Sequence, residues 1–363
     1  MMRLPAFAYR APRTVHEAAQ WLSDSPGDTI LLAGGTDLLP NMKRRQQMPR
    51  TVVALRGIAE LAAIVSGGRS VESEGAGEPS GPTPARRPGA GGTVIGAAVT
   101  LAALVRDDRI RASIPGLWQA AIQVATPHLR NMGTIGGNLC LDTRCTYYDQ
   151  SFEWRKAIDF CMKKDGRICW VATSSPRCLA VSSSDTAPML QALDARVRLV
   201  SASGQREIPL TAFYNNDGIQ YLTKRADEIL TEVIVPEQDG WRSTYWKLRR
   251  RGSFDFPVAA VAAAARLDAE GRVQAVRLVA GAVSSRPLSA PKAEALLVGE
   301  TLTDERIIAA AQAVYEIAKP MDNTDFELVW RKKMVTSLAT CALRELRGDD
   351  VRAARQRLAR SIL

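Results

Sequence analysis

Five of the six cysteines in this chain lie close together in the sequence. They are Cys140, Cys145, Cys161, Cys169 and Cys178. Thiols gathered in this way favour metal binding or redox chemistry over disulfides, unless the compartment is oxidising. Structural zinc sites usually take cysteines in closely spaced pairs, and here only the first two approach that spacing. Iron–sulfur clusters accept four thiolates at more varied spacings, so the pattern favours such a cluster over zinc or unreactive buried thiols.

Two glycine-rich turns are further candidates for chemistry. Residues 31–38 read LLAGGTDL, and residues 130–138 read RNMGTIGGN. Glycine lets backbone N–H groups come close to an anion, and the neighbouring hydroxyl and amide groups add hydrogen-bond donors. This arrangement suits a diphosphate, although an ordinary structural turn is the alternative for either motif alone. Neither motif is a Walker A loop or a Gly-x-Gly-x-x-Gly fingerprint, so no nicotinamide site is expected.

Composition narrows the class of protein. Hydrophobic residues make up 46% of the 363 residues and charged residues 24%, as in ordinary globular domains. No apolar run is long enough to cross a bilayer, and the N-terminus lacks a signal-peptide pattern, so we expect a cytoplasmic location. The net charge is +10, but the basic residues are scattered and few aromatic residues lie among them. An acidic protein partner is therefore favoured over nucleic acid, and neither a nucleic-acid nor a membrane partner is expected.

The elements that must position these residues follow from capping and periodicity. Near the N-terminus we expect a strand from Phe7, then a helix from Thr14 to about Leu22, followed by strands at 29–33 and 51–55. Residues 66–92 are rich in glycine and proline, which predicts a flexible loop joining a hairpin of 62–65 and 93–96, with a domain boundary as the alternative. Further helices are expected at 101–124, broken near Pro115, and at 154–163, which places Cys161 on a helix end.

The last third predicts an α+β domain. Strand-like runs at 243–249, 258–267 and 273–283 precede helical patterns at 291–297, 304–318 and 326–346. Earlier, a helix at 189–193 and a strand at 197–200 follow the cysteine segment. We expect one domain at 1–238, which contains an insertion at 139–182, and a second at 239–363. The predicted fold class is α+β.

These motifs carry a resemblance to a known family. Together with the sequence SDTAP at 184–188, the two glycine-rich turns resemble the FAD-binding subunits of the xanthine oxidase family in order and spacing. The resemblance implies a two-part FAD-binding domain, with a small βαβ-type unit and a mixed α/β unit, followed by a C-terminal domain of three strands and three helices. It implies no catalytic residue on this chain, because substrate chemistry would take place on a partner.

The same resemblance assigns the FAD ligands. Residues of the first turn would hold the diphosphate, residues of the second would line the diphosphate and ribityl region, and Asp185 would bind a hydroxyl of the flavin chain. These turn residues are Ala33, Gly34, Gly35, Thr36, Asp37, Thr134, Gly137 and Asn138. A side chain at Gly35 is expected to fill the space of the diphosphate. Lys247 would lie near the isoalloxazine ring, with a solvated strand lysine as the alternative.

The cysteine insertion resembles one branch of that family, the β subunits of 4-hydroxybenzoyl-CoA reductases. The resemblance rests on the run LDTRCTYY at 141–148, followed by cysteines 16, 8 and 9 residues further on. It implies a [4Fe–4S] cluster bound by Cys145, Cys161, Cys169 and Cys178. Cys140 would instead be a small residue behind the glycine turn, and Cys341 a core residue.

The implied function is electron transfer. Electrons would pass from an acidic ferredoxin through the cluster and FAD to a large molybdenum-cofactor subunit and a small [2Fe–2S] subunit, in a dimer of heterotrimers that dehydroxylates 4-hydroxybenzoyl-CoA. The alternatives are a molybdenum hydroxylase subunit for another aromatic substrate, and a zinc-stabilised scaffold without electron transfer. Seven basic residues of the insertion are expected to attract the acidic donor. They are Arg144, Arg155, Lys156, Lys163, Lys164, Arg167 and Arg177.

Overall fold

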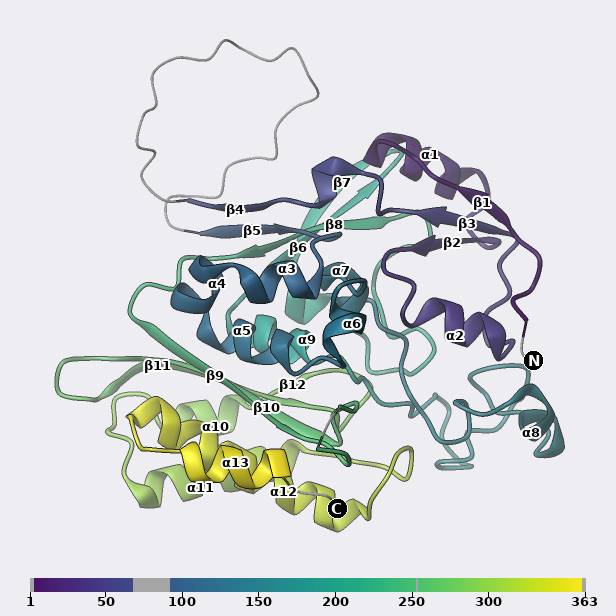
Figure 1. Cartoon of the computed structure of the whole chain (residues 1–363). Coiled ribbons are helices and arrows are strands. Elements are labelled where there is room, and N and C mark those ends of the chain that lie inside the picture. The colour runs from purple at the N-terminus through teal and green to yellow at the C-terminus, as the bar shows by residue number, and fades with distance from the viewer. Residues whose placement is uncertain (1–2, 68–91, 253, 361–363) are drawn as a thin grey trace, which may run out of the picture.

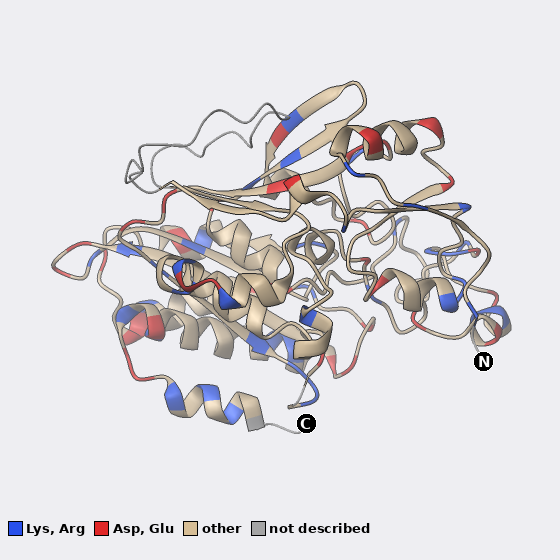
Figure 2. Cartoon of the chain, turned by 45° about the horizontal axis from the view of Figure 1, so that its top comes forward, with Lys and Arg blue, Asp and Glu red and all other residues tan. Residues whose placement is uncertain are grey.

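The computed structural model describes residues 3–67, 92–252 and 254–360. Residues 68–91 of the predicted flexible loop therefore lie outside the described residues. Within the described part, the chain forms three sheets, with helices between and below them (Figure 1). Lys and Arg are interspersed with Asp and Glu over this part of the chain (Figure 2). None of its helices is both long and apolar enough to span a membrane.

The N-terminal unit is a small parallel sheet with the strand order β1-β3-β2. The threonine hydroxyl of Thr14 accepts a hydrogen bond from the backbone N–H of Glu17, which confirms the predicted start of the first helix. The parallel pairing makes this unit the expected βαβ type. Its elements are β1 (Ala8–Arg10), α1 (Val15–Asp24), β2 (Thr29–Leu32), α2 (Leu38–Lys43), β3 (Thr51–Ala54) and the 3-10 helix η1 (Ala59–Leu61).

The second sheet has five antiparallel strands in the order β4-β5-β8-β6-β7. Strands β4 and β5 pair with Val65 opposite Val94, so the predicted hairpin is confirmed and the domain boundary at this point is wrong. The elements of this sheet are β4 (Ile64–Ser66), β5 (Thr93–Gly96), β6 (Arg196–Ser201), β7 (Gly204–Pro209), the 3-10 helix η2 (Leu210–Ala212) and β8 (Ile229–Val235).

A layer of short helices separates this sheet from the next one (Figure 1). The segment predicted as one helix at 101–124 forms three helices. One break lies at Pro115, as expected, and the other at Asp107. The Asp107 carboxylate accepts hydrogen bonds from the N–H groups of Arg109 and Ile110, and so starts a new helix. The helices are α3 (Leu101–Arg106), α4 (Asp108–Ser113), α5 (Pro115–Ile122), α6 (Pro127–Arg130), α7 (Ile135–Leu139) and α9 (Thr186–Ala192); α8 (Phe152–Ala157) lies in the insertion.

The C-terminal part is an antiparallel sheet with helices on its outer face (Figure 1). Its three long strands and three helices follow the prediction, and the structure adds the two-residue strand β12 and a last helix, α13. The predicted boundary at residues 238 and 239, just before β9, stays a prediction. The elements are β9 (Trp241–Leu248), β10 (Ala259–Leu267), β11 (Val273–Gly281), β12 (Leu288–Ser289), α10 (Pro291–Ala295), α11 (Asp304–Ile317), α12 (Leu328–Arg347) and α13 (Arg352–Arg360).

Strand β10 explains why the two halves of the molecule pack closely. Successive side chains of a strand point to opposite faces, and both faces of β10 are buried. Ala260, Ala262 and Ala264 belong to the core shared with the short helices, whereas Val261 and Ala263 belong to the core under α11 and α12. The alanine side chains are small, so helices can approach the strand from both sides. The α+β class predicted from the sequence is confirmed.

Candidate functional site

A cavity of about 460 Å³ opens where the two glycine-rich turns meet. The turn at 33–38 leads from β2 into α2. The second glycine-rich segment, residues 133–138, begins in a turn and continues into α7, which starts at Ile135. Residues 97–101 and 221–230 close other sides of the cavity. Two segments about one hundred positions apart in the sequence therefore build one site, which lies between the N-terminal unit and the rest of the chain.

The two turns approach each other too closely for side chains. A Cβ atom at Gly34 would lie 2.0 Å from the carbonyl oxygen of Met132, so only glycine fits there. Gly35 has a φ of +72°, a conformation that residues with a side chain rarely adopt. Its Cβ would meet the side chains of Leu32 and Leu39 at 3.1 Å. The expectation that a side chain at Gly35 would fill the diphosphate space stays a prediction; the positive φ is a separate reason why this position requires glycine.

Polar donors on the cavity wall are left for a ligand. Within the described residues, the backbone N–H groups of Gly34, Gly35 and Thr36 donate to no protein acceptor. The side-chain oxygen of Asn138 accepts hydrogen bonds from the hydroxyls of Ser184 (2.8 Å) and Thr186 (2.6 Å), which fixes the orientation of its amide. Backbone N–H groups that converge without a partner are suited to bind an anion such as a diphosphate.

Eight of the ten predicted FAD ligands line this cavity: Ala33, Gly34, Gly35, Thr36, Asp37, Thr134, Gly137 and Asn138. Their individual roles stay predictions. Two of these residues also have internal partners: the Thr134 hydroxyl accepts from the N–H of Gly137 at 3.0 Å, and Asp37 forms an ion pair with Arg144 of the insertion.

The other two predicted ligands, Asp185 and Lys247, are not part of the cavity lining. They form a buried ion pair with 3.0 Å between Lys247 Nζ and Asp185 Oδ2, and the Tyr245 hydroxyl donates to Asp185 at 2.8 Å. Burial raises the pKa of Asp185 and lowers that of Lys247, while each charge opposes the shift of the other. The alternative of a solvated strand lysine is wrong, because Lys247 is only 4% exposed. Contact of either residue with the flavin stays a prediction.

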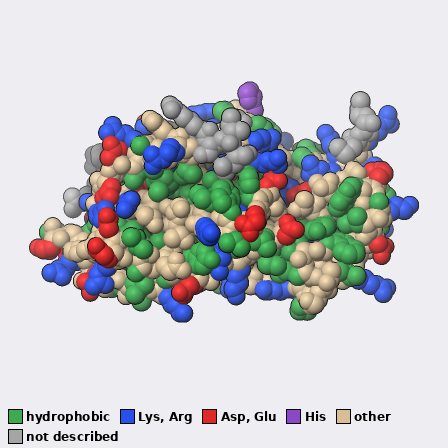
Figure 3. Space-filling view, turned by 90° about the horizontal axis from the view of Figure 1, so that it is seen from below, with side chains coloured by type: hydrophobic (Ala, Val, Ile, Leu, Met, Phe, Trp, Pro, Cys, Tyr) green, Lys and Arg blue, Asp and Glu red, His purple; other side chains and the backbone are tan. Residues whose placement is uncertain are grey.

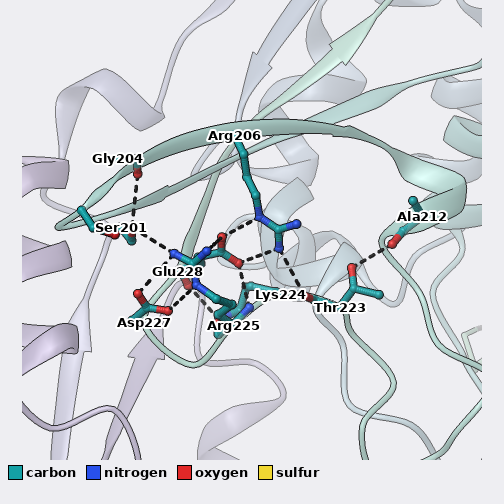
Figure 4. Close-up of polar contacts among 10 residues, drawn as sticks. Ser201, Gly204, Arg206, Ala212, Thr223, Lys224, Arg225, Asp227 and Glu228 are labelled. Carbon is teal, nitrogen blue, oxygen red and sulfur yellow. Dashed lines mark hydrogen bonds and ion pairs between the residues drawn. The ribbon is translucent and has the colours of Figure 1, made fainter.

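Sequence reasoning missed Lys224, the one Lys or Arg side chain among the described residues that line the cavity. Its ammonium donates to the carbonyl oxygens of Arg225 (3.0 Å) and Glu228 (2.7 Å), and burial lowers its pKa. Arg206 donates to the Glu228 carboxylate at 2.6 Å and so holds the loop in place (Figure 4). Lys224 lies outside both glycine motifs, so only the fold brings it to the site.

The four cysteines assigned to a cluster converge in the insertion. Cys145, Cys161, Cys169 and Cys178 are all buried and line one small cavity, together with Lys163 and Trp170. All six cysteines of the chain are free thiols. Within the described residues, no three Cys, His, Asp or Glu side chains are close enough to hold a single metal ion.

Burial controls the charge of these thiols. It raises the pKa of Cys145 to about 12 and that of Cys178 to about 11. Thiols with such pKa values keep their protons at neutral pH, so a metal would have to displace them. Cys140 lines the large cavity rather than the thiol cavity, and Cys341 packs at the edge of the C-terminal core.

The expectation that Cys161 lies on a helix end is wrong. Helix α8 ends at Ala157, and the next residues turn sharply, with φ values of 60° at Asp159 and 58° at Phe160. Two consecutive residues in this left-handed region cannot continue a helix. Cys161 therefore begins the tight turn that leads to Asp165.

The insertion is anchored to both neighbouring parts of the chain. On the N-terminal side, the buried Arg155 donates to the carbonyl oxygen of Arg44 in the turn after α2 at 2.9 Å. On the C-terminal side, Asn323 donates through Nδ2 to the carbonyl of Leu179 at 2.6 Å, and its own carbonyl accepts from the N–H of Thr146 at 3.0 Å. Asn323 thus fixes the backbone next to Cys145 and next to Cys178.

Comparison with known proteins identifies the class. Residues 5–77 and 86–238 match the family model described as the FAD binding domain in molybdopterin dehydrogenase. Residues 243–346 match the CO dehydrogenase flavoprotein C-terminal domain. The chain therefore belongs to the family of FAD-binding subunits of molybdopterin dehydrogenases, and it is an FAD-binding subunit of an oxidoreductase. The family resemblance seen in the sequence is confirmed.

Individual relatives cover nearly the whole chain. The aldehyde oxidoreductase FAD-binding subunit PaoB of Escherichia coli is 29% identical over 348 residues, or 92% of this chain and 98% of the relative. The nicotinate dehydrogenase FAD-subunit of Eubacterium barkeri is 28% identical over 334 residues, or 91% of this chain and 92% of the relative. Among solved structures, carbon monoxide dehydrogenase from Hydrogenophaga pseudoflava matches with a TM-score of 0.72 and 26% identity, over 94% of this chain and 98% of that chain.

Proposed function

We propose that this chain passes electrons from an external one-electron donor to a molybdenum-containing partner through a [4Fe–4S] cluster and FAD. The complex would be a 4-hydroxybenzoyl-CoA reductase, which removes the phenolic hydroxyl of its substrate on another chain. The alternative is a molybdenum hydroxylase that acts on a different aromatic compound. The proposed partners are a large molybdenum subunit and a small [2Fe–2S] subunit in a dimer of heterotrimers. The location would be the cytoplasm, which keeps thiols reduced.

The convergence of four buried thiols on one cavity carries the proposal. In a four-iron cluster each thiolate binds a different iron atom, so the thiols stand further apart than around a single ion. The four cysteines are free thiols, so all of them are available as ligands once a metal displaces their protons.

The large cavity fits the diphosphate part of FAD. The N–H groups of Gly34, Gly35 and Thr36 would bind its phosphate oxygens, and Lys224 would add a positive charge beside the bound cofactor. Bound FAD supplies the ability to accept and release electrons between one-electron and two-electron partners. The chain itself would hold and orient the cofactor. It also places the thiol cavity next to the large cavity, because Lys163 of the one pairs with Asp142 of the other.

Exposed apolar side chains support assembly with partner subunits. The face seen from below Figure 1, on the side of the C-terminal helices, carries apolar areas between charged residues (Figure 3). Ile308 of α11 is 58% exposed and Val329 of α12 is 51% exposed. Contiguous apolar patches on a protein surface are typical of sites that contact other proteins.

The purified complex should contain one FAD and about four iron atoms per copy of this chain, beyond the iron of the small subunit. Metal analysis of this subunit expressed alone and reconstituted with iron and sulfide, combined with its visible spectrum, checks this. Zinc is colourless, whereas flavin and iron–sulfur clusters absorb visible light. Zinc in place of iron would contradict the cluster. A spectrum without flavin absorbance would contradict the assignment of the large cavity to FAD.

The surface near the thiol site differs from the sequence expectation. Three of the seven basic residues expected to attract a donor are buried: Arg155, Lys163 and largely Arg144. Lys156, Arg167 and Arg177 are exposed, and Lys164 is partly exposed. Apolar side chains, including Trp154 (40% exposed) and Ile168 (43% exposed), lie among them. Glu153, Asp159 and Asp165 are exposed in the same segment, so the excess of positive charge is small. The proposed donor, a small acidic redox protein, would be attracted by Lys156, Arg167 and Arg177.

Reduction by an acidic ferredoxin should slow as salt increases. Oppositely charged surfaces attract over a Debye length of about 8 Å at physiological ionic strength, and added salt shortens it. The double substitution Lys156→Glu and Arg167→Glu should slow reduction at low salt by about tenfold or more. Lys292→Glu on α10, whose side chain is 80% exposed, is the matched control and should have little effect. Stopped-flow measurement decides, and a salt-independent rate or efficient turnover with NADH alone would contradict the proposed donor.

A further inference from the structure

A buried ion pair lies in the wall between the two cavities. Lys163 lines the thiol cavity, whereas Asp142 lines the large cavity. Lys163 Nζ is 2.8 Å from Asp142 Oδ1, and the two side chains are only 6% and 8% exposed. The positive end of the pair therefore faces the thiols, and the negative end faces the proposed flavin site.

The positive end is next to a proposed cluster ligand. Lys163 Nζ donates to the carbonyl oxygen of Gly218 at 2.5 Å. The backbone of Gly218 packs against Cys178, because a Cβ atom at Gly218 would lie 2.7 Å from Cys178 Sγ. The N–H of Gly218 also donates to the Cys178 carbonyl at 2.9 Å. The ammonium group is thus fixed close to one thiol of the set.

The pair cannot reorient easily. An ammonium group has three donors, and those of Lys163 reach Asp142, the Thr143 hydroxyl at 2.8 Å, and Gly218. The rings of Tyr148 and Tyr221 flank the nitrogen at 4.9 and 5.5 Å from their centroids. The Tyr148 hydroxyl donates to the second Asp142 oxygen at 3.1 Å. The two charges therefore form a dipole of fixed direction.

We propose that the Lys163–Asp142 dipole shifts the reduction potentials of the thiol-bound cluster and of FAD in opposite directions. For the cluster, this inference rests on the proposed function. A one-electron reduction adds one negative charge, which a nearby cation stabilises and a nearby anion opposes. The reduction potential of each centre is affected most by the charge that lies nearer to it. Lys163 thus raises the potential of the cluster, and Asp142 lowers that of the flavin, which becomes the stronger reductant.

The test removes both charges together with the double substitution Lys163→Met and Asp142→Asn. Neither charge is then left buried without a partner, which protects the fold. Redox titration of the complex, followed by EPR for the cluster and by absorbance for FAD, should show opposite shifts: the cluster potential falls and the flavin potential rises. Shifts in the same direction, or no shifts, would overturn the proposal.

The neighbouring pair provides a matched control. Lys164 and Asp165 are 3.2 Å apart, but their side chains are 35% and 40% exposed. Solvent screens such charges, so Lys164→Met with Asp165→Asn should move either potential much less. If wild-type protein holds no iron, the proposed function fails, and the flavin potential alone then decides this inference. It must still rise in the Lys163→Met and Asp142→Asn protein for the dipole to stand.

Discussion

Replacing any one of Cys145, Cys161, Cys169 or Cys178 by Ser should reduce the iron bound to this chain from about four atoms to nearly none, while FAD remains bound. Each of the four thiols lines the same buried cavity, so the loss of one leaves a cluster site incomplete. None of them lines the large cavity, which is why flavin should be retained. Iron analysis and flavin absorbance on the same samples measure both effects.

Two other cysteines serve as controls for this experiment. Cys341 lies at the edge of the C-terminal core, and Cys140 lies on the wall of the large cavity; the variants are Cys341→Ser and Cys140→Ser. Both variants should keep their iron. Should Cys140→Ser lose its iron while Cys145→Ser retains it, the ligand set would have to be reassigned.

Gly34→Ala should weaken FAD binding by about tenfold or more, because it forces apart the two turns that form the cavity. The added Cβ would lie 2.0 Å from the Met132 carbonyl oxygen and 2.9 Å from Gly133 Cα, both of them backbone atoms. Gly35→Val should also lose FAD, through strain at its positive φ. The ratio of flavin to protein after gel filtration measures both effects.

Gly27→Ala is the control for the glycine substitutions. It lies in the same N-terminal unit, and its Cβ would meet nothing within 4 Å. This variant should bind FAD as the wild type does. Full flavin content in Gly34→Ala would show that the close approach of the two turns is not needed for binding.

The sequence predicted the parts of the site that are continuous in the chain. The glycine motifs could be recognised because close backbone approach and positive φ select glycine at fixed positions, as at Gly34 and Gly35. The strands β9, β10 and β11 could be predicted from their long apolar runs. The hairpin of β4 and β5 was predictable because both strands are short apolar runs that flank a polar segment.

Features that depend on distant contacts could not be predicted in this way. Lys224 reaches the cavity because Arg206 and Glu228 fix its loop, and the sequence gives no sign of that pairing. Lys163 looked like one of several surface charges of the insertion, yet it is buried against Asp142, 21 positions earlier. Helix periodicity also missed the turn before Cys161, where two residues adopt positive φ without any glycine.

The anchoring of the insertion by Asn323 has a consequence for how the protein matures. Asn323 lies 144 positions after Leu179, and it holds the backbone beside two of the four clustered thiols. During synthesis the cysteines leave the ribosome long before this residue does. The thiol pocket therefore gains this anchor only when the chain is almost complete, so the cluster proposed above would be inserted after translation, into a folded polypeptide.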